Sequence, residues 1–206
     1  GITSGVLAVA GIAYLSYDQI QLNKLKGIAS IGETNFENIK KSPHGDALIQ
    51  KGADFTRRSM LSNAAWPTKV RTYAVEGADS EMIKRYGTNV YKFQTNQAIR
   101  VAGLRSQMDI LQSDHARALA KPLSKELAPL SLSGKLYIQK MPPEKFSKFT
   151  IETLRRSAWD GSEMGTSAKV YSDLLKRHGY SAVNDLNLPG SAARVLIDKN
   201  VFDLVK

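Results

Sequence analysis

Residues 171–206 read YSDLLKRHGYSAVNDLNLPGSAARVLIDKNVFDLVK, and this stretch indicates the fold class. Its beginning continues a helix capped by Ser167, in which apolar residues recur every three or four positions from Val170 to Leu175. Gly179 ends that helix. Three short strands are then expected, over residues 181–183, 194–198 and 201–205. Because helices and strands mix without regular alternation here and upstream, the sequence predicts an α+β fold.

The preceding residues repeat this mixture. Val70, Thr72 and Ala74 alternate with Arg71, Tyr73 and Val75, and this period of two predicts a strand over residues 70–75. Further strands are expected over residues 90–95, 99–101 and 135–139. Helices are expected over residues 81–86, 104–120 and 143–158. The basic α+β domain therefore spans residues 69–206.

Residues 24–68 form a predicted helical connector. They are polar, with breaks at Gly32, Pro43 and Gly45. A helix is expected to begin at Asp46 and to carry Phe55. Pro67 ends this region.

The first 17 residues, GITSGVLAVAGIAYLSY, carry no charged side chain. Three interpretations stay open: a membrane or assembly anchor, a secretory signal, and a helix buried in a globular core. We favour an anchor over residues 1–23, because a spanning helix needs about 20 mostly apolar residues and aromatic residues suit its ends. Its contact residues would be Val6, Leu7, Val9, Ile12, Tyr14, Leu15 and Tyr17.

The rest of the chain is basic. Residues 24–206 hold 29 Lys and Arg against 18 Asp and Glu, and the chain has no cysteine. This charge favours nucleic acid, anionic lipid or an acidic protein as partner. Five adjacent pairs are the candidate polyanion-binding residues: Lys40 and Lys41, Arg57 and Arg58, Lys84 and Arg85, Arg155 and Arg156, Lys176 and Arg177. Aromatic residues that could stack on bases are sparse near these pairs in the sequence.

The quoted ending resembles that of phage and mobile-element domains assigned to the ADP-ribosyltransferase-like fold. Residues 70–103, VRTYAVEGADSEMIKRYGTNVYKFQTNQAIRVAG, are similar in layout to the first strand, short helix and hairpin of those domains. The resemblance covers about residues 69–206. It implies a mixed sheet and an NAD-binding cleft in active members.

The catalytic pattern of that family matches only in part. The resemblance implies an arginine on the first strand, which would be Arg71, and a serine turn before an inner strand, which would be Ser131 and Ser133. It also implies a Glu-x-Glu pair, but the corresponding position holds Asp185 and Asn187. No essential glutamate is therefore present, and we expect no catalysis and no cofactor.

Two functional hypotheses follow. The preferred one is a non-catalytic structural protein of a phage or mobile element, associated with a virion or a membrane. Homo-oligomers are among the assemblies that we consider for it. The alternative is a divergent mono-ADP-ribosyltransferase or toxin that uses NAD. No metal site is expected, because His44, His115 and His178 show no ligand spacing.

Overall fold

The chain forms two compact units that interleave along the sequence. The helical unit comprises residues 1–37 and 111–167, and the sheet unit comprises residues 38–110 and 168–206. The expected segments 1–23, 24–68 and 69–206 follow one another, whereas in the structure residues 111–167 pack with the first helix. The computed structural model describes residues 2–40, 45–60, 72–77, 81–159, 165–185 and 193–205.

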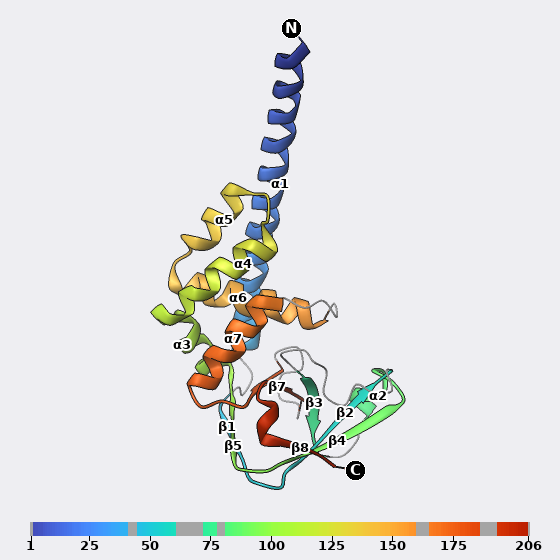
Figure 1. Cartoon of the computed structure of the whole chain (residues 1–206). Helices are drawn as coiled ribbons and strands as arrows, with labels where there is room; N and C mark the ends of the chain where they lie inside the picture. The colour runs from blue at the N-terminus through green and yellow to red at the C-terminus, as the bar shows by residue number, and fades with distance from the viewer. Residues whose placement is uncertain are drawn as a thin grey trace. The chain divides into compact units, whose positions relative to one another are not determined.

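The helical unit is built around α1 (Ile2–Ile39), the long blue helix in Figure 1. It also contains η1 (Asp114–Leu119), α4 (Ala120–Leu127), α5 (Leu132–Gln139) and α6 (Pro143–Trp159). Two helices have residues in both units, α3 (Leu104–Gln112) and α7 (Gly165–Arg177). The buried side chains of the helical unit include Leu25, Leu123, Ile138, Phe146 and Phe149.

The sheet unit contains eight strands among its described residues. They are β1 (Ala47–Ile49), β2 (Asp54–Ser59), β3 (Thr72–Glu76), β4 (Asn89–Thr95), β5 (Ile99–Ala102), β6 (Ala182–Asn184), β7 (Ala193–Leu196) and β8 (Phe202–Val205). The sheet order is β1-β5-β6-β7-β3-β2-β4-β8, with β5 and β6 parallel and the other neighbouring strands antiparallel. The short helix α2 (Glu81–Lys84) precedes β4, and η2 (Lys199–Val201) precedes β8.

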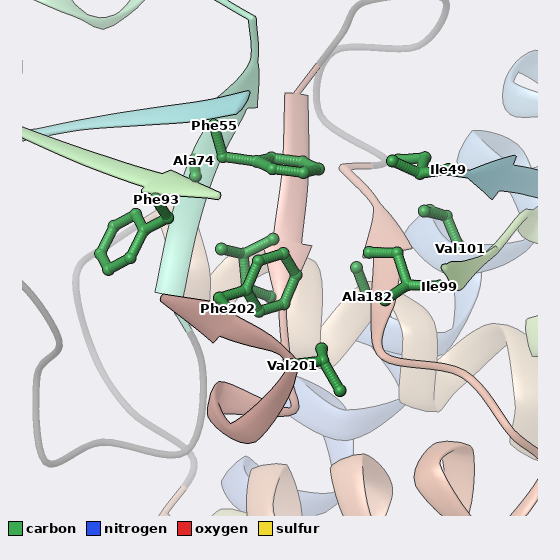
Figure 2. Packing of buried hydrophobic residues seen from close by; sticks show 10 residues of the cluster. Ile49, Phe55, Ala74, Phe93, Ile99, Val101, Ala182, Val201 and Phe202 are labelled. Carbon is green, nitrogen blue, oxygen red and sulfur yellow. The ribbon is translucent and has the colours of Figure 1, made fainter. Parts of the chain in front are cut away.

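One face of this sheet carries the apolar core. Phe55 and Phe93 lie opposite each other on β2 and β4, and the rings of Phe55 and Phe202 meet edge to face with centroids 5.3 Å apart. Ile49 and Val101, from β1 and β5 at the other end of the strand order, belong to the same cluster (Figure 2). Since strands from both ends of the sheet share one core, the sheet curves around it.

The α+β class is confirmed by the mixed sheet, and several elements correct the prediction. Residues 135–139 are helical in α5 instead of extended, because Ser131 caps that helix through the N–H of Gly134. The helix expected from Asp46 is wrong, since β1 and β2 occupy this part of the chain. The helix expected over residues 104–120 breaks at Ser113, and α4 continues through Pro122, which lies in its first turn and is tolerated there.

Candidate functional site

Residues 10–16 of α1 form an exposed, charge-free run. Residues 10–16 are all exposed, and Ile12 and Leu15 are each 66% exposed. A side chain at Gly11 would meet nothing within 4 Å. Figure 1 shows these turns of α1 extending past α4, α5 and α6. The predicted contact residues Ile12, Tyr14 and Leu15 are therefore open to solvent in the single chain.

Of the other predicted contact residues, one is less exposed and three have side chains outside the described part of the structure. Tyr17 is half-buried. Val6, Leu7 and Val9 belong to the helical backbone of α1, but their side chains lie outside the described residues. Among the helices described, none combines the length and apolarity needed to cross a bilayer.

Packing of α1 begins at Asp18. Its carboxylate accepts hydrogen bonds from Ser131 Oγ at 2.8 Å and from the Ser133 backbone N–H at 3.1 Å. Hydrogen bonds from the Ser133 and Ser131 side chains lower the pKa of Asp18. About two helical turns further along α1, Leu25 is only 1% exposed. The N-terminus of α5 is therefore bound to α1 at Asp18.

A buried glutamate of α6 binds the second half of α1. Glu152 is 2% exposed and accepts hydrogen bonds from Asn35, Arg155 and Arg156 at 2.7–3.0 Å. Burial opposes ionisation, but these donors outweigh it and lower the pKa of Glu152. The predicted polyanion pair Arg155 and Arg156 therefore serves an internal carboxylate.

Lys148 makes a second set of contacts between α6 and α1. Its ammonium lies 2.8 Å from Glu33 and 2.9 Å from Glu144, and 5.0 Å from the ring centre of Phe36. Hydrogen bonding to Glu33 is the main cause that raises the pKa of Lys148. The charge of Lys148 is therefore balanced by carboxylates of the same unit.

Most of the positive charge belongs to the sheet unit. Its residues 38–110 and 168–206 hold 18 Lys and Arg against 10 Asp and Glu, which is +8 of the total +10. Lys40 and Arg177 are exposed, Lys176 pairs with Asp173 at 3.0 Å, and Lys41 lies outside the described residues.

The structure brings two of the predicted basic pairs together. Arg57 and Arg58 lie on β2, and α2, which ends at Lys84, packs against this strand (Figure 1). Arg58 Nη1 donates a hydrogen bond of 3.1 Å to the carbonyl of Gly87. Desolvation lowers the pKa of the half-buried Arg57. Four of the ten predicted polyanion residues thus lie on β2 or at the end of α2: Arg57, Arg58, Lys84 and Arg85. We call this part of the sheet unit, β2 with α2 and the residues that follow it, the lobe.

Gly87 makes this close approach possible. Its φ is +142°, and a Cβ there would stand 2.1 Å from the backbone carbon of Ser59. Only glycine fits such a contact between two backbones. The loop after α2 is therefore held against the end of β2.

Aromatic residues accompany this lobe, contrary to the sequence expectation. The rings of Tyr73 and Tyr86 lie 5.4 Å apart, and the guanidinium of Arg85 lies 5.0 Å from the Tyr86 ring centre. Tyr91 stands opposite Arg57 in the β2–β4 register. The pairing of Arg85 with Tyr86 was visible in the sequence, whereas Tyr73 joins them only through the fold. We call Arg58, Lys84, Arg85, Tyr86 and Lys92 the Tyr86 surface.

Of the residues implied by the transferase resemblance, the structure describes Ser131, Ser133 and Asp185. Arg71 and Asn187 lie outside the described residues. Ser131 is fully buried at the N-terminus of α5, and the backbone of Ser133 binds Asp18 in the same helical unit. Asp185 is buried in the sheet unit and hydrogen-bonds with Tyr73, whose pKa is raised first by burial. Ser131 and Asp185 thus have structural partners in different units.

In comparisons with known proteins, no family model, no curated protein and no solved structure matches the chain. In the described part of the chain, no group of three His, Asp or Glu side chains is placed to hold a metal ion.

Proposed function

We propose that this chain is a non-catalytic structural protein of a phage or mobile element. It attaches to a larger assembly through the first 16 residues and holds a polyanion on its basic sheet unit. The observation that carries the proposal is the run of exposed, charge-free residues 10–16 on a continuous helix.

Exposure of an apolar helix to water is unfavourable, so we expect these residues to be buried against a partner. Burying apolar surface gains about 25 cal/mol per Å². The segment has apolar or small residues on every side, a pattern typical of a helix surrounded by neighbours. A partner on one face alone would leave the opposite side in water.

Copies of this chain supply neighbours on several sides. In a symmetric bundle, each helix contacts at least two others, and closed symmetry is the usual form of protein oligomers. Ala10, Gly11 and Ala13 are small and exposed, and small residues let helix backbones approach closely. We therefore take a bundle of α1 helices as the attachment.

A membrane surface is the second candidate cover. Tyr14 and Tyr17 followed by Lys24 and Lys26 form the aromatic and basic border that interfacial helices show. Neutral and anionic vesicles distinguish this candidate from the bundle.

Sedimentation velocity over a protein concentration series tests the attachment. The full chain should form oligomers, the double substitution Ile12→Glu with Leu15→Glu should be monomeric, and Leu130→Glu should behave like the unchanged chain. Leu130 is the matched control, because it is 67% exposed in the same unit but does not belong to α1. A monomer at every concentration contradicts the bundle. Flotation of that monomer with vesicles, lost in the double variant, would transfer the attachment to lipid.

A further inference from the structure

We infer that the Tyr86 surface binds single-stranded nucleic acid, with a base stacked on Tyr86 and the neighbouring cations on the phosphates. The inference rests on the polyanion part of the proposed function and names its ligand. It is independent of how α1 attaches.

The aromatic part of this surface is fixed by its neighbours. Tyr86 follows α2 and its N–H donates to the carbonyl of Ile83, whose side chain is buried. The Tyr73 ring lies against Tyr86 at 5.4 Å with a 52° tilt. Even so, Tyr86 remains 39% exposed. A ring that is held in place but accessible loses little side-chain entropy when a base stacks on it.

Arg85 contacts the ring, and Arg58 and Lys92 lie on the strands β2 and β4. Arg85 lies over Tyr86, with its Nη2 3.0 Å from the phenolic oxygen. Arg58 reaches the Gly87 carbonyl, one residue after Tyr86. Thr56 and Arg58 are two residues apart on β2 and therefore lie on the same face of the sheet. Lys92 of β4 stands opposite Thr56, so it lies on that face as well. Guanidinium groups suit both phosphate binding and stacking beside bases.

The combination favours a single strand over the other polyanions. Cations alone would serve a duplex or an anionic bilayer equally well, because both present phosphates. Of the two forms of nucleic acid, a single strand has unpaired bases that are free to stack on an exposed tyrosine, whereas a duplex does not. Stacking tolerates any base, so the binding would be independent of sequence.

Fluorescence anisotropy of the full chain with a labelled oligothymidylate tests this inference. Three variants are compared: Tyr86→Ala, Tyr86→Phe and Tyr137→Ala. Tyr137 is the matched control, since it also has a cation near its ring, Lys145 at 5.4 Å, but belongs to the helical unit. We expect Tyr86→Ala to weaken binding about tenfold, while Tyr86→Phe and Tyr137→Ala bind like the unchanged chain. A thermal melt of each variant shows that the fold is retained.

Salt dependence and competing ligands separate stacking from charge. Lys92→Gln should lower the slope of affinity against salt, whereas Tyr86→Phe should not change it. The inference is overturned if Tyr86→Ala binds oligothymidylate as tightly as the unchanged chain. It is also overturned if a duplex of equal length or phosphatidylserine vesicles bind as tightly, and in those cases the polyanion proposal survives. If none of the three ligands binds at low salt, both fail.

Discussion

Ser131 Oγ donates a hydrogen bond of 2.8 Å to the Asp18 carboxylate and accepts one of 2.9 Å from the Gly134 N–H. This contact ties the N-terminus of α5 to α1 at the point where α1 changes from exposed to packed. Residues 10–16 of α1 are exposed before this contact, and the first described buried side chain after it is Leu25.

Replacing Ser131 should destabilise the helical unit. Ser131→Ala removes the cap of α5 and leaves Asp18 with fewer donors, and loss of an N-cap costs about 1 kcal/mol. Urea unfolding measures the change in the free energy of unfolding. In a double-mutant cycle, Ser131→Ala and Asp18→Ala should couple, since each removes the same contact. Additive effects would show that the two residues act independently.

Gly87→Ala should be more damaging than an ordinary surface substitution. The new Cβ would stand 2.1 Å from the Ser59 backbone, and the φ of +142° is strained for alanine. We expect a loss above about 2 kcal/mol in the free energy of unfolding. Gly11→Ala is the control, because open space surrounds it and it lies in a helix. Equal stability of the two variants would contradict the close approach of the loop to β2.

Acid should weaken the packing of α6 against α1. The folded pKa of Glu152 lies below its ordinary value near 4.5, so its stabilising effect is present above that pH and is lost as the pH falls through the folded pKa. Glu152→Gln should reduce stability at neutral pH and flatten the fall below about pH 4.5. Chemical denaturation at several pH values measures both effects. An unchanged pH profile in the variant would rule out this carboxylate as the cause.

No turnover of NAD is expected. Glycosidic cleavage needs a fixed carboxylate beside the developing positive charge. Asp185 is buried and hydrogen-bonded with Tyr73, and the hydroxyl of Ser131 is bound to Asp18. Incubation with NAD, with and without protein acceptors, should release no nicotinamide. Turnover that disappears in Asp185→Ala would establish the enzyme hypothesis instead.

The sequence predicts elements best where one local pattern dominates. The alternating residues of β4 and the apolar spacing of α6 were sufficient for a correct assignment. It fails where a cap or a partner decides. Residues 135–139 have strand-like composition, but capping by Ser131 and packing of Ile138 make them helical. β1 and β2 depend on pairing with β5 and β4, which are distant in the chain.

The candidate sites show the same limit. The charge-free start of α1 is readable from the sequence, because it needs no partner to be recognised. The contact between Arg58 and the loop after α2 cannot be predicted from the sequence. It depends on Gly87, which lets this loop lie close to β2, and on Tyr73, which belongs to another strand. The spacing of Arg155 and Arg156 from Glu152 is that of local helix pairs, but the sequence does not show that this glutamate is buried.

The environment of residue 12 tests the proposed attachment most directly. The chain has no cysteine, so Ile12→Cys and Leu130→Cys each accept one polarity-sensitive fluorophore. As the protein concentration rises without lipid, emission from residue 12 should move to shorter wavelength while emission from residue 130 stays unchanged. If residue 12 remains in water over the whole series, α1 does not form the bundle.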